Sequence, residues 1–166
     1  MTTAPTERLV GRAPADRSAT AELVLAFEQR VRTRYVAQLE DGRPIAVVVP
    51  RGSVLRGGEC WITESGLVVT IRAAHESLLQ VMTADALLLA RAAYHLGNRH
   101  VAVQIAPGLL RIAHDPVLGR LLAGLGLTPT AEVGPFEPEG GAYGHDHAHA
   151  GAGHSLAPVI HEYRPA

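Results

Sequence analysis

Polar and apolar residues alternate along residues 30–39, a period of two that is typical of a half-buried β-strand. Asp41-Gly42 follows as a tight-turn dipeptide, and the apolar run 45–49 predicts the returning strand of a hairpin. Further short strands are predicted at 60–63, 67–72 and 77–81, with Gly66 in the turn between the first two. Strands at this spacing favour a small β-sandwich or barrel-like domain.

The first 20 residues show little periodicity and are rich in Thr, Ala, Pro and Arg. We expect a loose arm there, with some order near Leu9 and Val10. The N-terminal β domain is accordingly assigned to residues 1–82, including this arm.

The spacing of apolar residues changes near Thr83 to three and four, which predicts a helix. Thr83 can cap this helix, and Asp85 suits its positive N-terminal end. We expect Gly97 to be the left-handed residue that ends it. The expected apolar face comprises Ala84, Leu87, Leu88, Ala92 and Leu96.

The following segment alternates strands with one more helix. Strands are predicted at 101–105 and 109–113, joined by a turn at Pro107-Gly108, and a last strand at 128–133. Asp115 and Pro116 predict the start of the second helix. Its expected apolar face comprises Val117, Leu118, Leu121, Leu122 and Leu125. The order favours an α+β domain over 83–134, with two helices on one face of an antiparallel sheet.

Residues 135–166 carry few side chains that could form a core, and residues 135–141 are rich in turn-forming residues. A segment of this composition cannot bury enough apolar surface to offset the entropy of ordering. We therefore expect a mobile C-terminal tail over 135–166.

Composition narrows the possible functions. The chain has 166 residues and a formal net charge of −1, and all 15 of its basic residues are arginine. Neither half is strongly basic, which argues against a surface for nucleic acid or anionic membrane. No segment resembles a signal peptide or an apolar membrane span of ~20 residues, so we expect a cytoplasmic protein.

The predicted tail has a composition typical of metal binding. His145, His147 and His149 alternate, with Asp146 between the first two and His154 close behind. Imidazole suits nickel, copper and zinc, and several of these rings could surround one ion. The alternative is a tail that binds no metal.

His100 is a second candidate ligand, because it follows the expected end of a helix, where a side chain can stand clear of the surface. Two copies that meet across a two-fold axis would supply two imidazole nitrogens to one ion. In isolation, a capping or hydrogen-bonding role is the simpler interpretation. The same holds for His95 and His114, while His75 is expected to be a loop residue, His161 could be an accessory ligand and Cys60 a buried structural cysteine.

No enzyme motif is present. The chain lacks a Gly-x-Ser-x-Gly nucleophile elbow, and without lysine it cannot form a Gly-x-x-x-x-Gly-Lys phosphate loop. A metal-dependent hydrolase would need an open coordination position and a general base, and Asp146 is the only carboxylate beside the ligand histidines.

Several segments together resemble one known family. They are residues 39–43, 50–59, 92–101, 110–112, 117–118 and 135–145. The most specific is 92–101, Ala-Ala-Tyr-His-Leu-Gly-Asn-Arg-His-Val. Over roughly residues 28–149 the chain resembles the UreE family, the nickel metallochaperones of urease maturation.

This resemblance implies an N-terminal β domain, a ferredoxin-like C-terminal domain, and a homodimer formed through the C-terminal domains. It implies that His100 is the metal ligand at the dimer interface, and it adds a set of tail ligands: His145, His147, His149 and His154. The implied cargo is Ni(II), with Zn(II) or Cu(II) able to bind the same sites. The implied partner is the complex of urease apoprotein with its accessory proteins, including a GTPase.

One departure concerns the start of the second helix. Many members of the family carry His-x-His there, whereas this chain has His114-Asp115-Pro116, which argues against an accessory metal site. The alternative to a delivery protein is a histidine-rich metal buffer or store without a client.

Overall fold

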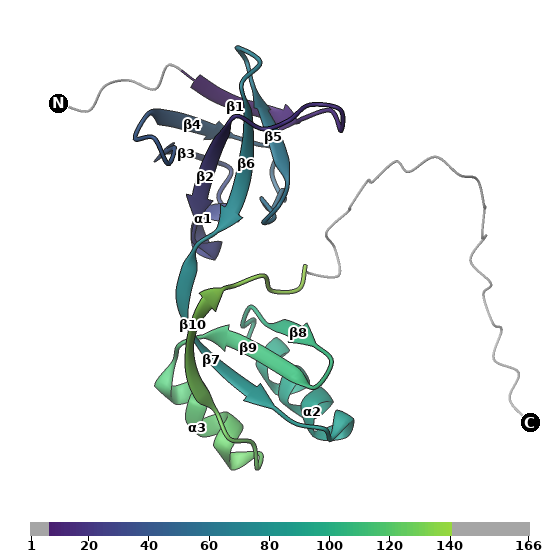
Figure 1. Ribbon diagram of the computed structural model, residues 1–166. Helices are drawn as coiled ribbons and strands as arrows, with labels where there is room; N and C mark the ends of the chain where they lie inside the picture. Colours follow the sequence, from purple (N-terminus) through teal and green to yellow (C-terminus); the bar gives the residue numbers. More distant parts are fainter. Residues whose placement is uncertain (1–6, 141–166) are drawn as a thin grey trace, which may run out of the picture.

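The computed structural model describes residues 7–140, which form two domains (Figure 1). The N-terminal domain contains six strands and one short helix, α1 (Phe27–Arg30). The strands are β1 (Glu7–Arg12), β2 (Ala21–Leu25), β3 (Arg34–Gln38), β4 (Pro44–Val48), β5 (Cys60–Thr63) and β6 (Val68–Ala73).

These six strands form one sheet in the order β2-β6-β5-β1-β4-β3, in which the β1–β4 and β2–β6 pairs are parallel. The Glu40 amide donates to the Glu22 carbonyl at 3.0 Å, which links the two ends of the sheet into a nearly closed barrel. The core is formed mainly by the inward residues Leu9, Leu23, Leu25, Ile45, Val47, Leu55, Trp61, Val69 and Ile71. The expected barrel-like domain is therefore confirmed.

The N-terminal segment departs from the expectation of a loose arm. Residues 7–12 form β1, a central strand, and Leu9 is fully buried. β2 was also missed, because the alternation within each segment is too short to be seen without the partner strands that bury it. The strand expected from Arg30 begins instead at Arg34, after helix α1.

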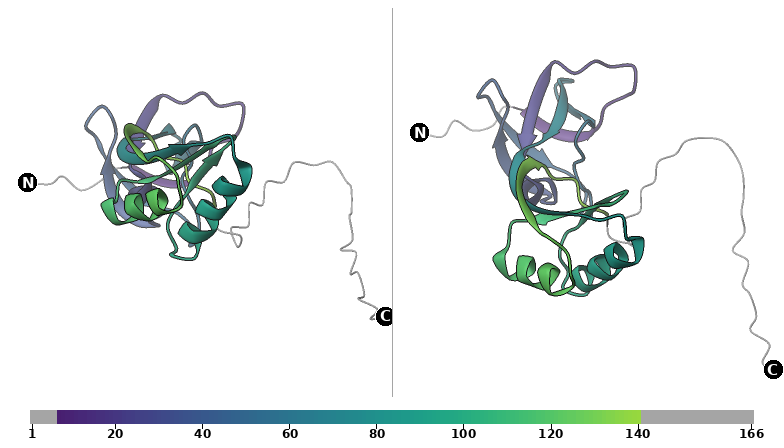
Figure 2. Two further views of the ribbon diagram at one scale, coloured as in Figure 1. Left: turned by 90° about the horizontal axis from the view of Figure 1, so that it is seen from below. Right: turned by 60° about the horizontal axis from the view of Figure 1, so that its bottom comes forward.

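The second domain has the order strand, helix, strand, strand, helix, strand. Its elements are β7 (His75–Met82), α2 (Ala86–Gly97), β8 (Gln104–Ala106), β9 (Leu109–Ala113), α3 (Pro116–Gly124) and β10 (Thr130–Pro135). The strands form an antiparallel sheet in the order β10-β7-β9-β8. Both helices cover the same face of this sheet, as expected (Figure 2).

β7 belongs to this second sheet, since it pairs with β9 and β10. The sequence-based division at residue 82 counted it with the N-terminal strands. A period of two identifies a strand but carries no information about which sheet the strand joins, so the error came from chain order alone.

Both helices begin at aspartate caps. The Asp85 carboxylate accepts from the amides of Leu87 and Leu88 at 2.9 and 3.0 Å, and Asp115 caps α3 in the same way, with proline at the first helical position. Thr83 does not cap α2; its hydroxyl accepts from the Asp85 amide. The cap expected at Asp115 is therefore confirmed, whereas the cap of α2 is Asp85 rather than the expected Thr83; both carboxylates supply acceptors for amides that have no partner within the helix.

The core of the second domain lies between the helices and the sheet. Its buried residues are Leu79, Val81, Ala92, Leu96, Val103, Leu110, Ile112, Leu122 and Leu127. Three residues expected on the apolar faces are instead exposed. Leu87 at 61% and Val117 at 62% lie in the first turn of their helix, and Ala84 precedes the start of α2.

The residues after β10 pack between the two domains, although they were expected to belong to a mobile tail. Phe136 is 1% exposed, and its ring meets that of Phe27 edge to face at 5.6 Å. The Glu137 amide donates to the Gln104 side chain at 3.1 Å, and the Glu139 amide donates to the Val103 carbonyl at 2.8 Å. The expectation is therefore wrong for residues 135–140.

Three residues of the N-terminal domain hold this segment. Arg30 is fully buried, donates to the Phe136 carbonyl and forms an ion pair with Glu137 at 2.7 Å. The Gly57 amide donates to the same carboxylate at 2.8 Å. Arg56 donates to the Pro138 carbonyl at 2.6 Å. We call Arg30, Arg56, Gly57 and residues 136–139 together the interdomain clasp.

The remaining tail expectation, for residues 141–166, lies outside the described residues. Across residues 7–140, no helix is both long and apolar enough to cross a membrane.

Candidate metal site at the end of helix α2

Helix α2 ends in a pair of hydrogen bonds that reverses the chain. The Val101 amide donates to the Leu96 carbonyl at 3.2 Å, and the His100 amide donates to the Gly97 carbonyl at 2.9 Å. These bonds define a Schellman motif, which supplies donors to carbonyls that the helix leaves free. Leu96 and Val101 both pack into the domain core, as this motif favours.

His100 occupies the left-handed position of this motif, with φ of 56°. It is the only non-glycine with positive φ in residues 7–140. Gly97 was expected to take that role, but it lies inside the helix and is not among the glycines with positive φ. The left-handed position is usually glycine because a Cβ is strained there, although histidine tolerates it better than most residues.

The reversal fixes the direction of the chain on either side of His100. Val101 turns into the core, while His100 itself is exposed at the end of the helix. The C-terminal end of a helix carries partial negative charge, which favours a nearby cation. The Arg99 guanidinium already lies in this field, where it donates to the His95 carbonyl at 2.9 Å. A cation coordinated by His100 would experience the same favourable field.

One imidazole at this position is not a complete metal site. In the part of the chain that the structure describes, no group of three or more His, Cys, Asp or Glu side chains is arranged to hold a metal ion. A site at His100 therefore requires ligands from outside residues 7–140, from a second copy of the chain, or from solvent. The predicted tail ligands His145, His147, His149 and His154 all lie outside the described residues, as does His161.

The other candidate residues have local roles. The His95 ring lies 5.4 Å from that of Tyr94, edge to face. His114 donates its amide to the Ser77 carbonyl and directly precedes the α3 cap, while His75 pairs with Pro135 at the start of β7. Cys60 is half-buried rather than buried, with its sulfur 3.7 Å from the Thr70 hydroxyl. None of these residues approaches His100 in a group able to bind metal.

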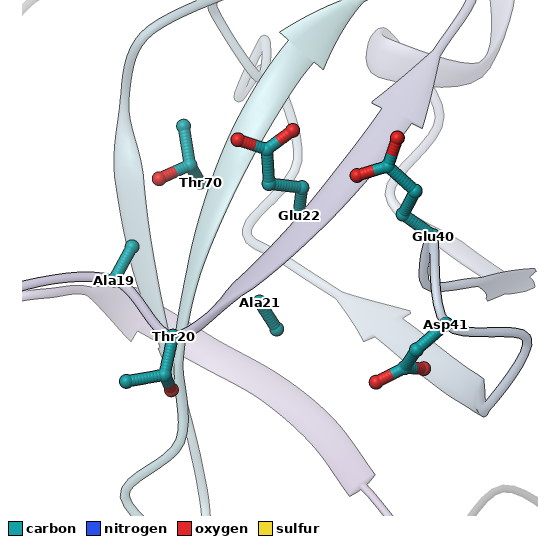
Figure 3. Close-up of a pocket in the computed structure, with 7 residues that line it drawn as sticks. All are labelled: Ala19, Thr20, Ala21, Glu22, Glu40, Asp41 and Thr70. Atoms are coloured by element: carbon teal, nitrogen blue, oxygen red, sulfur yellow. The ribbon is translucent and has the colours of Figure 1, made fainter.

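The N-terminal domain contains an open pocket of about 530 Å³ (Figure 3). Its acidic lining comprises Glu22, Glu40 and Asp41. Glu22 pairs with Arg72 at 3.4 Å, and Asp41 pairs with Arg43 at 2.8 Å. A hydrogen bond from the Arg43 amide is the main cause that lowers the pKa of Asp41. Glu22 and Asp41 thus have arginine partners within the domain, and the three carboxylates do not form a metal-binding group.

Arg30 and Glu137, the two charged residues at the centre of the clasp, were not expected from the sequence. One signal was available, because Phe136 is one of only two phenylalanines in the chain and lies between two prolines. A large aromatic side chain in an otherwise turn-rich segment indicates burial rather than solvent exposure.

Comparison with known families accounts for both domains. The model described as the UreE urease accessory protein, N-terminal domain, matches residues 6–74. The model described as the UreE urease accessory protein, C-terminal domain, matches residues 76–164. The two matches meet where the first sheet ends and β7 begins. The fold and the matches thus define a two-domain accessory protein, and the chain belongs to the UreE urease accessory protein family.

Individual relatives agree. The urease accessory protein UreE of Alkalilimnicola ehrlichii is 51% identical over 139 residues, which cover 84% of this chain and 83% of the relative. The protein of the same name from Burkholderia pseudomallei is 47% identical over 141 residues, which cover 85% of this chain. That match covers 66% of the relative, so the chain spans just under two thirds of its length.

Proposed function

We propose that this protein is a metallochaperone that binds Ni(II) and delivers it to the urease apoprotein during urease maturation. The family assignment supports this proposal, because the relatives are named urease accessory proteins. The observation that carries it within this chain is His100, which occupies an exposed left-handed position at a helix C-terminus. The relatives' names also weigh against the metal-dependent hydrolase considered above.

The proposed metal site combines two copies of His100 with histidines of the tail. A homodimer through the second domains would bring each His100 beside its mate, and His145, His147, His149 and His154 would capture the ion and complete its coordination. Zn(II) and Cu(II) would compete for the same nitrogens, since the general order of affinities places Cu(II) above Ni(II). Selectivity must then come from geometry and supply.

The proposal extends to the architecture. The element order of residues 75–135, with strands in the order β10-β7-β9-β8, supports a ferredoxin-like arrangement of the second domain. We place the domain boundary at residues 74–75, between β6 and β7, rather than at 82–83. The proposed partner is a complex of urease apoprotein and accessory proteins that includes a GTPase, in the cytoplasm.

The number of Ni(II) ions bound per dimer tests this site. Equilibrium dialysis should compare the wild-type protein with His100→Ala and with a chain in which the four tail histidines are alanine. We expect His100→Ala to lose the ion shared by the dimer and to keep the capacity of the tail. Equal binding by wild type and His100→Ala would contradict the proposed site.

A metal buffer without a client remains the second candidate, because five of the nine histidines lie in residues 142–166. Removal of the tail histidines distinguishes a metal buffer from a delivery protein. A buffer would lose most of its capacity and nothing else, whereas a delivery protein would keep the His100 site and still support urease activation.

A further inference from the structure

The interdomain clasp determines where the C-terminal residues leave the folded part of the protein. β10 lies at one edge of the second sheet and β8 at the other, with β7 and β9 between them. Residues 136–139 cross from the end of β10 to the loop before β8, where the Glu139 amide bonds to Val103 (Figure 1). Three strand spacings amount to about 14 Å. The chain therefore continues from the β8 side of the domain.

This exit point is close to His100. Val103 follows His100 by three residues, which span at most about 10 Å. His145, the first tail histidine, follows Glu139 by six residues, which span at most about 20 Å. The first tail histidine of a protomer can consequently reach the His100 of the same protomer.

Contacts from the other domain fix this exit point. The buried Arg30 guanidinium donates to the Phe136 carbonyl, to Glu137 and, at 3.4 Å, to the Leu55 carbonyl. A charge that is fully buried depends strongly on its partner, so this pair is costly to break from either side. Glu137 also lies 3.5 Å from the Arg56 guanidinium.

We propose that Arg30 is a positioning residue for metal capture, which it promotes by holding residues 136–139 so that the chain leaves the folded domains within reach of His100. The proposal rests on the proposed function, in which these histidines share a metal ion. Without the clasp, the tether to His145 would start at Pro135 and would contain ten residues instead of six. Effective concentration falls as about the −3/2 power of tether length, so this change alone is worth about twofold. The start of the tether would also move by about 14 Å across the sheet, away from His100, which lowers the effective concentration of His145 further.

The first test measures amide hydrogen exchange in the full-length, metal-free protein. The Glu139 amide is the reporter, because its bond to Val103 involves no atom of Arg30. We expect Arg30→Ala to accelerate its exchange by at least about tenfold, as expected when a buried ion pair is lost. The control is Arg32→Ala, which removes an exposed guanidinium paired with Glu28 and should change nothing at Glu139. Unchanged exchange at Glu139 in folded Arg30→Ala would overturn the proposal.

The second test measures Ni(II) affinity with and without the tail ligands. Wild type and Arg30→Ala are each compared with the same chain carrying alanine at His145, His147, His149 and His154. We expect the tail's contribution, taken as the ratio of the two affinities, to fall at least about twofold in Arg30→Ala. If Arg30→Ala accelerates Glu139 exchange but leaves the ratio of affinities unchanged, the positioning role of Arg30 is overturned and the tail ligands are not. A wild-type affinity independent of the tail would overturn the proposed tail ligands as well.

A second variant covers the case in which Arg30→Ala does not fold. A Cβ at Gly57 would lie 2.6 Å from the Glu137 carboxylate, and Gly57 does not have positive φ, so the carboxylate can move aside without backbone strain. Gly57→Ala should therefore accelerate Glu139 exchange and reduce the tail's contribution. Gly11→Ala, whose Cβ would meet no atom within 4 Å, is the control. Unchanged exchange in Gly57→Ala would also overturn the proposal.

Discussion

The left-handed conformation of His100 leads to a prediction that separates stability from metal binding. With φ of 56°, the residue holds its Cβ close to the following carbonyl, at a cost of roughly 1–2 kcal/mol for a non-glycine residue. His100→Gly removes that strain. The greater freedom of glycine in the unfolded chain destabilises the folded state by roughly 0.5–1 kcal/mol and so offsets part of this gain. Between the midpoints of these two ranges, the net expectation is a metal-free protein that is more stable by about 0.8 kcal/mol.

His100→Ala is the matched comparison, because alanine loses the imidazole but keeps the strained Cβ. Both variants should lose the shared Ni(II) ion equally, whereas His100→Gly should be the more stable by about 1 kcal/mol. In a domain of this size, such a difference shifts Tm by about 4–8 °C. Urea and thermal unfolding should be measured with a chelator present, since bound metal would stabilise only the wild type. Equal stability of the two variants would refute the assignment of strain to this residue.

Three further predictions concern other parts of the protein. Asp115→Ala should destabilise the protein by about 1 kcal/mol in urea unfolding, because the amides of Val117 and Leu118 lose their acceptor, and an unchanged midpoint would argue against the cap. Burial raises the pKa of Tyr35 to about 12, while an unfolded tyrosine ionises near pH 10. Stability should therefore fall between these two pH values, and Tyr35→Phe should abolish that part of the loss; equal alkaline profiles would contradict the burial of this hydroxyl. Ni(II) affinity should weaken as pH falls through about 6.5, the ordinary range of histidine, because imidazole binds metal only when neutral. Calorimetric titrations at pH 5.5 and 7.5 would test this, and equal affinities at the two pH values would disprove histidine ligands.

Features that depend on neighbouring residues were predictable from the sequence. Asp41-Gly42 predicted its hairpin, and Gly42 does have positive φ, at 84°. Asp115 and Pro116 predicted the start of α3 to the residue. In each case the hydrogen bonds or dihedral angles involved are confined to a few consecutive residues, so local chemistry decides the outcome.

Features that depend on distant residues were not predictable. β1 is a strand because β4 and β5 pair with its two edges, and both lie more than 30 residues further along the chain. The burial of Phe136 likewise depends on Phe27 and Arg30, more than 100 residues earlier. Composition gave the opposite expectation for residues 135–140, since it takes no account of a surface that another domain provides.

The position of His100 at a helix end could be predicted, but its backbone conformation could not. Glycine is the usual left-handed residue at a helix C-terminus, so Gly97 was the natural expectation. The helix instead continues through Gly97, and Leu96 and Val101 bracket the reversal by packing into the core. Tertiary packing thus selected which residue ends the helix.

Delivery of nickel is the central claim, and reconstituted urease activation tests it most directly. Nickel-loaded wild type or His100→Ala would be mixed with urease apoprotein and its accessory proteins. The urease activity obtained with the two proteins would then be compared. We expect wild type to activate urease and His100→Ala to lose most of that activation, even where its tail still binds Ni(II). Equal activation by the two proteins would contradict the account.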